Sequence, residues 1–453
     1  MTLRFRRFLY IIFILAFLII TPLIISSAAG YKISFSLTGP FFIQKTGMLV
    51  LDSNPEGAKI YINNIPQRQF FNPFFGGGNG FITTPAKIKD LVPGEYDVKI
   101  EEDGYWPWEK KLKINPGEST FAENIYLFRD NLPIEITTGT IKGLSMSPDK
   151  NHMVFNKNGE EIDLLSTAND EIQKINIDPK INSFLWSPDS RKIMAGHYIY
   201  DLDSGKTTDL NILINPQAAA LKWDLSDSNV IYFINPKNKK MIITSLDLNS
   251  LQKKELLLFQ NLQDYLIKNG VAYVIVQNGN NVKFNIYSGG KLVSGSPLLK
   301  FSHYKFINPE NSLINLYNPD LETLYLVDPL NNFALQDEIH NVKNAIWIDN
   351  NRLLYFNDFE IWLYDKNSQA QNLFTRVSTP IISVFWHPSN NYIFYTTDNS
   401  VNSLELDDRD KRNTLELVKL DKISVPFFNS DSGSVYFEGK IGNKEALYKL
   451  MLQ

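Results

Sequence analysis

Cysteine is absent from the 453-residue sequence, so the chain has no disulfides and no thiol chemistry, and it suits a reducing or an oxidising compartment equally. Histidine is scarce, and no two of the five stand at the spacing of metal ligands: His152, His197, His303, His340 and His387. The sequence has no Gly-x-Ser-x-Gly elbow, no phosphate-binding glycine loop and no His-Glu-x-x-His motif. We therefore expect no metal, no cofactor and no catalytic residues.

An excess of positive charge is also lacking. The formal net charge is −4, from 45 basic and 49 acidic residues. No acidic residue accompanies Arg4, Arg6 and Arg7 within the first thirty positions, and removing these three leaves 42 basic against the same 49 acidic residues. A nucleic-acid-binding surface usually shows the opposite balance, so we expect no nucleic-acid partner.

A long apolar run is present near the N-terminus. From Phe8 to Ile25 every residue is apolar except Tyr10 and Thr21, and roughly 20 such residues cross the hydrocarbon core as a helix. The preceding arginines place the short N-terminus in the cytosol and the bulk of the chain outside. We expect a cytosolic tip and single-pass transmembrane helix at residues 1–29, and then a spacer at 30–47. The small residues 26–29 leave a cleaved signal peptide as the alternative, and both readings export the chain.

Residues 48–128 have the pattern of a small β domain. Met48–Asp52 and Lys59–Ile62 read as strands joined in a hairpin, and further strands are expected at 95–101, 110–114 and 121–128. The intervening Pro55-Glu56-Gly57-Ala58 spells the tetrapeptide that names the PEGA domain. Later segments resemble that family's later positions: Thr84-Pro85, Pro93-Gly94-Glu95-Tyr96 and Gly104-Tyr105. The resemblance implies a β-sandwich-like extracytoplasmic module, often found in surface-layer and membrane-anchored proteins, without enzymatic activity.

One loop departs from this pattern. Between residues 66 and 81, three consecutive glycines are surrounded by Phe70, Phe71, Phe74, Phe75 and Phe81. Clustered exposed aromatic side chains mark contact surfaces, so this loop is a candidate contact with the membrane or with a partner. The alternative is that the phenylalanines fold back onto their own domain or the next one, because most large apolar side chains are buried.

Two other clusters have structural interpretations. Tyr105, Trp106 and Trp108 could stack on a sugar ring, but the core of the small domain is the simpler role. An acidic group of three residues alternates with basic ones and reads as a solvated loop: Asp407, Asp408 and Asp410.

The remainder of the chain, residues 129–453, is repetitive. Eight apolar runs follow polar turns of the Ser-Pro-Asp kind and begin at Met153, Ile193, Val230, Val271, Leu313, Leu353, Ile393 and Val435. Their spacing of about forty residues, with strand-like contents, predicts a β-propeller. Tryptophan recurs just before the turn position, at Trp186, Trp223, Trp347 and Trp386. These units resemble TolB-type and WD-type propeller repeats, although Lys150 and Ser190 occupy that pattern's glycine position.

Eight units favour eight blades, and seven is the alternative if one weak unit is an insertion. The units at Val271 and Leu353 have no proline in the turn and are the weakest. The last unit has only about three strands before Gln453. A strand at Leu132–Thr138 precedes the first unit, and we predict that it completes the ring by pairing with the last one.

The expected fold is therefore mainly β: a transmembrane helix, a PEGA-like domain and a propeller. These features favour a non-catalytic, membrane-anchored, extracytoplasmic binding or scaffold protein, whose propeller face binds an envelope protein or a cell-wall glycan. A sensor or assembly factor that steadies neighbouring membrane proteins is a related possibility. The alternative from another class is an exported enzyme that acts on a glycan with carboxylates in the propeller pocket.

Overall fold

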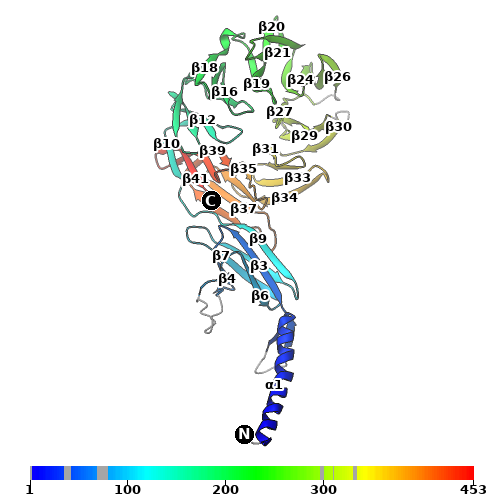
Figure 1. The fold of residues 1–453 in the computed structure, drawn as a ribbon. Coiled ribbons are helices and arrows are strands. Elements are labelled where there is room, and N and C mark those ends of the chain that lie inside the picture. Colours follow the sequence, from blue (N-terminus) through cyan, green and yellow to red (C-terminus); the bar gives the residue numbers. More distant parts are fainter. Residues whose placement is uncertain (1–2, 35–41, 69–79, 296–299, 310, 330–333) are drawn as a thin grey trace.

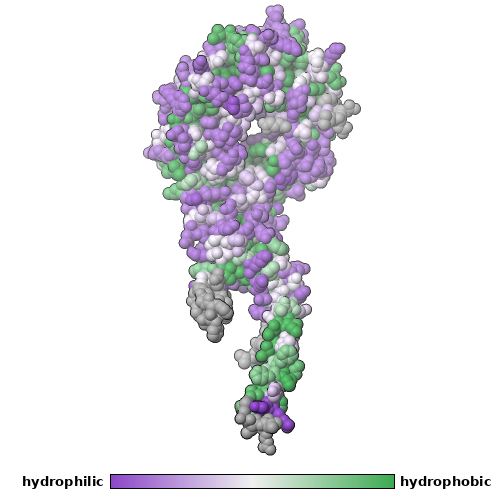
Figure 2. Space-filling view, in the orientation of Figure 1, coloured by the Kyte–Doolittle hydropathy of each residue, from purple (hydrophilic) through white to green (hydrophobic). Residues whose placement is uncertain are grey.

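A computed structural model describes residues 3–34, 42–68, 80–295, 300–309, 311–329 and 334–453. Three parts follow one another in Figure 1: an apolar helix, a small β domain and a ring of sheets. The helix α1 (Leu3–Ala28) has 26 residues and at ~1.5 Å each is long enough to cross a bilayer. Its stretch from Phe5 to Ala28 is the one candidate span among the described residues, and it is unburied. Figure 2 shows this helix as a continuous apolar surface below a largely hydrophilic body.

The expected spacer contains some secondary structure. Strands β1 (Tyr31–Ser34) and β2 (Phe42–Lys45) pair antiparallel directly after the helix. Thr46 donates two hydrogen bonds, from its amide and its hydroxyl, to the carbonyl oxygen of Gly30. The chain therefore enters the small domain from a short hairpin.

The small domain consists of two sheets that enclose one apolar core. The first has the order β6-β3-β9, with bounds β3 (Gly47–Asn54), β6 (Ala86–Leu91) and β9 (Ser119–Tyr126). The second has the order β5-β4-β7-β8, with bounds β4 (Lys59–Ile62), β5 (Ile65–Pro66), β7 (Gly94–Glu101) and β8 (Trp108–Ile114). The alternating burial along β8 fits a strand with one face against a core and one against solvent.

The predicted hairpin between Met48–Asp52 and Lys59–Ile62 is wrong. These segments are strands β3 and β4, but they belong to different sheets, because β3 pairs with β6 and β9 and β4 pairs with β5 and β7. The turn at Pro55–Gly57 carries the chain from one sheet to the other. Ser53 fixes this crossing, since its hydroxyl bonds the carbonyl of Pro55 at 2.7 Å and the hydroxyl of Thr84 at 2.6 Å.

Eight four-stranded antiparallel sheets make up the described part of the C-terminal region. The first four are β11 (Ile141–Met146), β12 (His152–Lys157), β13 (Glu161–Ser166), β14 (Ile172–Ile175); β15 (Phe184–Trp186), β16 (Lys192–Ala195), β17 (Tyr198–Asp201), β18 (Lys206–Asp209); β19 (Ala219–Trp223), β20 (Val230–Lys237), β21 (Lys240–Asp247), β22 (Lys253–Phe259); and β23 (Leu262–Lys268), β24 (Val271–Asn278), β25 (Asn281–Ser288), β26 (Lys291–Gly295). A short 3-10 helix, η1 (Leu210–Ile212), follows the second sheet.

The last four sheets are β27 (Lys305–Ile307), β28 (Ile314–Asn318), β29 (Thr323–Asp328), β30 (Ala334–Ile339); β31 (Asn344–Trp347), β32 (Arg352–Phe356), β33 (Glu360–Asp365), β34 (Ala370–Arg376); β35 (Ile381–Trp386), β36 (Tyr392–Thr397), β37 (Ser400–Glu405), β38 (Thr414–Lys419); and β39 (Lys422–Asn429), β40 (Ser434–Ile441), β41 (Lys444–Met451), β10 (Ile134–Thr138). The eighth sheet takes its outer strand from the start of the region. Strand β10 pairs antiparallel with β41, which confirms the predicted pairing of the early strand with the last unit.

Apolar clusters join each sheet to the next and close the ring. Every pair of successive sheets shares one cluster of buried side chains. The last of these clusters packs Met153 and Phe155 of the first sheet against Tyr436 and Leu447 of the eighth. First strands of neighbouring sheets contact each other in three places, β11 with β15, β23 with β27 and β35 with β39, which fits first strands on the inner side of the ring. The ring is hollow at its centre in Figure 2.

The turn after each inner strand also links neighbouring sheets. Asp149 donates its amide to the Ser190 hydroxyl of the next turn, and Asp189 donates its amide to Ser228 in the turn after that. Ser190 has φ +62°, a left-handed conformation that favours glycine. Its bond to Asp149 explains why a serine stands there. Lys150, with φ +61°, reaches back to Ser430 of the eighth sheet's turn.

Two of the recurring tryptophans also bridge neighbouring sheets. The indole Nε1 of Trp186 donates to the carbonyl of Ser145 at 3.3 Å, and Trp223 donates to the carbonyl of Leu185 at 3.0 Å. Each acceptor lies on the inner strand of the preceding sheet. These two indoles satisfy a backbone carbonyl of the neighbouring sheet. The indole of Trp347 instead donates to the Asn315 side chain of the preceding sheet, and that of Trp386 donates to Asn390 in its own turn.

Candidate functional site

Two regions lie on the side of the propeller that carries the turns after the inner strands, which we call the turn face: the junction with the small domain and a pocket at the inner strands. The junction lies at the seventh and eighth sheets. Tyr126 donates its amide to the Tyr392 hydroxyl at 3.2 Å, and Arg129 donates its amide to the carbonyl of Leu452 at 3.0 Å. Phe128 is buried in the cluster shared by these two sheets. The end of the small domain is thus part of the propeller's own core.

A buried ion pair holds the two domains together. Lys110 on β8 has a fully buried side chain, and its Nζ lies 2.7 Å from Oε2 of Glu405 at the end of β37. The same Nζ donates to the carbonyl of Asp407 at 2.7 Å. Glu405 also accepts bonds from the Trp108 indole and the Asn413 amide, both at 2.9 Å. Buried charges are tolerated only when paired and hydrogen-bonded, and this network fulfils both conditions.

Histidine 387 lies in the aromatic part of this junction. Its ring is 4.6 Å from that of Tyr126 and 5.6 Å from that of Phe394, centroid to centroid. Its Nδ1 is 2.7 Å from the hydroxyl of Ser389. Burial disfavours the charged imidazolium and lowers the pKa of His387 to about 4. The neutral ring is therefore a packing element of the junction at physiological pH.

The acidic loop, expected to be solvated, also takes part in this junction. Arg409 donates to the carbonyl of Phe121 at 2.7 Å, and Asp410 accepts from the Lys111 amide at 3.3 Å. Burial raises the pKa of Asp407, but hydrogen bonds from Arg409 and the charge of Lys110 outweigh it, so that pKa is lowered overall. Residues 408–411 are exposed, as expected of a solvated loop, and the loop in addition bonds to the small domain.

Sequence reasoning missed Lys110 and Glu405. A signal existed for the lysine: on β8 the inward positions are Trp108, Lys110, Leu112 and Ile114, so strict alternation puts one charge on the buried face. No such signal marks Glu405, because every residue of β37 is buried.

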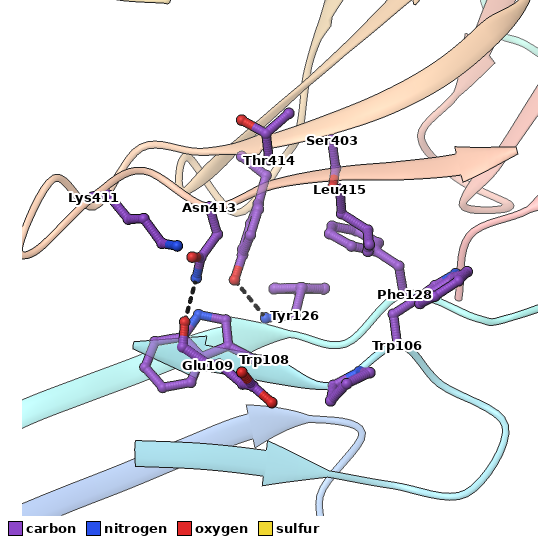
Figure 3. A pocket seen from close by; sticks show the side chains of 12 residues that line it. Trp106, Trp108, Glu109, Tyr126, Phe128, Ser403, Lys411, Asn413, Thr414 and Leu415 are labelled. Atoms are coloured by element: carbon purple, nitrogen blue, oxygen red, sulfur yellow. Dashed lines mark hydrogen bonds between the residues drawn. The ribbon is translucent and has the colours of Figure 1, made fainter. Parts of the chain in front are cut away.

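A cavity of about 320 Å³ lies beside the ion pair; we call it the junction cavity. Figure 3 shows it between the small domain, which contributes Trp106, Trp108 and Glu109, and the propeller, which contributes Ser403, Asn413 and Thr414. The aromatic residues at positions 105, 106 and 108 therefore pack in two different places. Trp108 and Tyr105 pack with the core of the small domain, as the structural interpretation expected, whereas Trp106 packs against the propeller.

A larger pocket of about 630 Å³ lies at the inner strands of the second to fifth sheets; we call it the inner-strand pocket. Most of its wall is apolar: Leu185, Trp186, Leu221, Trp223, Leu225, Tyr265, Leu266, Ile267 and Phe306, with Pro148, Pro188 and Pro309 from the turns. Its polar groups are already bonded. Lys222 lies 2.5 Å from Asp264, and Tyr232 donates to Asp224 at 2.8 Å.

The phenylalanine loop is only partly described. Phe70, Phe71, Phe74 and Phe75 lie outside the described residues. Phe81 is 37% exposed, and the Arg68 guanidinium carbon lies 4.9 Å from its ring centroid. A contact of this loop with the membrane or a partner stays a prediction. Among the described residues, no three His, Cys, Asp or Glu side chains gather as metal ligands would.

Comparison with known proteins agrees with this architecture. Residues 76–125 match the PEGA domain model. No curated protein matches the chain. A solved structure titled "Structure of Dos1 propeller" is similar over 72% of this chain and 96% of its own length, at 12% identity and a TM-score of 0.50. A eukaryotic initiation factor crystal structure, at 10% identity, covers 67% of this chain and 82% of its own, with a TM-score of 0.46.

At 12% identity the likeness to the Dos1 propeller shows the fold alone. The matched model covers most of the small domain, from before β6 into β9. The tetrapeptide at residues 55–58 lies outside the matched residues. The chain carries a PEGA domain joined to a β-propeller, behind an apolar N-terminal helix that is compatible with a membrane anchor or a signal sequence.

Proposed function

We propose that the protein is a non-catalytic scaffold at the cell envelope, anchored by its N-terminal helix, whose propeller binds an envelope protein or a cell-wall glycan. The observation that carries this proposal is the junction. A buried, hydrogen-bonded ion pair and a shared aromatic core fix the propeller to the PEGA domain. Such a connection holds the ring at a defined orientation to the PEGA domain, as a presenting scaffold requires.

The charge of the N-terminal segment supports a location outside the cell. Arg4, Arg6 and Arg7 precede the apolar helix, which favours a cytosolic N-terminus and an exported remainder. The propeller and the PEGA domain then stand on the extracytoplasmic side, and the PEGA domain lies next to the membrane.

The inner-strand pocket supports binding rather than catalysis. Glycoside hydrolysis uses two carboxyl groups about 5 to 10 Å apart. The eight inner strands contain one acidic residue, Asp264, and Lys222 neutralises it at 2.5 Å. The enzymatic alternative would need its carboxylates from loops.

The pocket wall favours a protein partner over a glycan at this site. The side-chain polar groups of Lys222, Tyr232 and Tyr265 bond to groups of the propeller itself. Leu185 in the same wall is 45% exposed. Large apolar side chains of a partner could bury this surface without leaving polar groups of the pocket unpaired. Central apolar anchors of this kind carry most of the binding energy in protein interfaces.

The test is a capture experiment with the full chain in detergent, against solubilised envelope proteins and purified wall polymer. We expect saturable capture of a protein that Leu185→Asp abolishes. The matched control is Leu258→Asp, since Leu258 is 52% exposed on the outer strand β22 and should tolerate the charge. Retention of wall polymer would make the glycan the partner, and its hydrolysis would establish the enzyme. Equal capture by wild type and Leu185→Asp would contradict the use of this pocket.

A further inference from the structure

We infer that the junction cavity is a second binding site, which takes one ring of a sugar. This inference concerns the small domain's side of the ring and does not depend on a partner at the inner-strand pocket. Cavities between domains that combine aromatic walls with a few directed polar groups are common small-ligand sites. At about 320 Å³ the junction cavity is near the lower end of their usual range, roughly 300 to 1,000 Å³, which suits a single ring.

Polar groups without partners line this cavity. The indole Nε1 of Trp106 is buried and has no hydrogen-bond partner in the described part of the chain. Ser403 is 3% exposed, and its hydroxyl makes no hydrogen bond to any described residue. The Tyr392 hydroxyl accepts from the Tyr126 amide but donates its own proton to no described group. Polar groups this well buried normally have partners, so three unused donors around one cavity point to a ligand.

Aromatic faces complete the site. Trp106 and Tyr126 are partly exposed at the cavity, and Phe128 closes the wall behind them. Asn413 fixes the opposite side, because its amide nitrogen donates to the Glu109 carbonyl and to Glu405, both at 2.9 Å. The Asn413 side-chain oxygen accepts none of the hydrogen bonds among the described residues, so an acceptor is available beside the donors.

A sugar ring matches this combination of groups. Its hydroxyls both donate and accept hydrogen bonds, and its apolar C–H face packs on aromatic rings. A purely apolar side chain would leave the Trp106 and Ser403 donors unpaired, at a cost that a hydroxylated ligand avoids. An anion would find Lys411 at the rim but also the carboxylate of Glu109. A neutral or weakly charged pyranose satisfies more of the cavity's polar and aromatic groups than an apolar side chain or an anion does.

The experiment uses the full chain in detergent with three probes: methyl β-glucopyranoside, N,N′-diacetylchitobiose and digalacturonic acid. Saturation-transfer difference NMR and tryptophan fluorescence report binding. Sorbitol is the control probe, because it carries hydroxyls without a ring face. We expect at least one pyranoside to bind saturably, with Ser403→Ala and Trp106→Phe each weakening it about three- to tenfold.

Matched variants separate this inference from the proposed function. Trp186→Phe, in the inner-strand pocket, should leave sugar binding unchanged, as should Leu185→Asp. The inference is overturned if no pyranoside saturates below about 20 mM, if sorbitol binds equally well, or if binding survives both Ser403→Ala and Trp106→Phe. Each of these results leaves protein capture through the inner-strand pocket untouched.

Discussion

The two arcs of the propeller use the same repeated turn in opposite ways. At the seventh sheet the turn residues His387 and Asn391 contact Tyr126 and Asn124 of the PEGA domain. At the first, second and fifth sheets the equivalent prolines, Pro148, Pro188 and Pro309, line an open pocket. One arc of the turn face is therefore covered by the chain itself, and another arc of that face remains accessible.

The same repeated turn thus forms both a joint between domains and the edge of an open pocket. In the covered arc, Lys110 and Glu405 form an ion pair inside the interface, and hydrogen bonds fix the geometry of the contact. The open arc has an apolar wall whose few polar groups are already bonded. Hydrogen-bonded charges define a single arrangement, whereas an apolar wall tolerates different partners.

The largest expected effect comes from breaking the joint. Lys110→Met leaves Glu405 buried without its cation, and removal of one partner of a buried pair typically costs about 3–5 kcal/mol of unfolding free energy. The double variant Lys110→Met/Glu405→Gln removes both buried charges and keeps one acceptor oxygen, which can serve the Trp108 indole, so it should recover part of that loss. Chemical denaturation measures both.

The control for this prediction is an exposed pair. Lys237 and Glu255 lie 3.4 Å apart with side chains 60% and 56% exposed, so Lys237→Met should change the unfolding free energy by less than about 1 kcal/mol. A similar loss in both single variants would contradict the special role of the junction.

The second effect is a pH dependence at the same joint. Folding holds the pKa of His387 at about 4, below the ordinary value of 6.5. As pH falls from 6.5 towards 4, the unfolded chain takes up a proton that the folded protein does not. The unfolding free energy should therefore decrease through this window, by roughly 3 kcal/mol at most, and be insensitive to this group above it.

Comparison with His387→Gln isolates that contribution from other titrating groups. The variant should show a flatter decline between pH 6.5 and 4, measured as thermal or denaturant stability. Parallel pH profiles for wild type and variant would show that the imidazole is more accessible to water than its packing implies.

The smallest effect concerns the links between sheets. Ser190→Ala keeps the left-handed backbone strain but removes the acceptor for the Asp149 amide, so it should cost about 1 kcal/mol. Ser190→Gly also loses the acceptor but relieves the strain, and its loss should be smaller. If the two variants lose the same unfolding free energy, the backbone conformation at residue 190 is not strained.

Local pattern predicted much of this architecture. The forty-residue period located the inner hairpins, including the units at Val271 and Leu353, which form strands despite their lack of proline. The pairing of β10 with β41 was predictable because the last repeat has only three strands of its own and needs a fourth. Sheet membership in the PEGA domain did not follow, because a turn at Pro55 suits a hairpin and a crossover equally.

The candidate sites were harder to predict. The inner-strand pocket and the junction cavity are formed by residues up to three hundred positions apart, such as Trp108 and Asn413, and no local pattern reports such proximity. Buried charge at Lys110 was visible only as a break in alternation on β8. No pattern in the loop around Asp407 indicates that it contacts the PEGA domain.

The most direct test of this account asks whether the PEGA domain and the propeller form one rigid body. Because the chain has no cysteine, Glu56→Cys and Lys254→Cys provide a unique pair of spin-label sites, one on each domain. Double electron–electron resonance on the full chain should give a single narrow distance distribution, which broadens when Lys110→Met is added. A broad or multiple distribution in the otherwise unaltered protein would contradict a fixed junction.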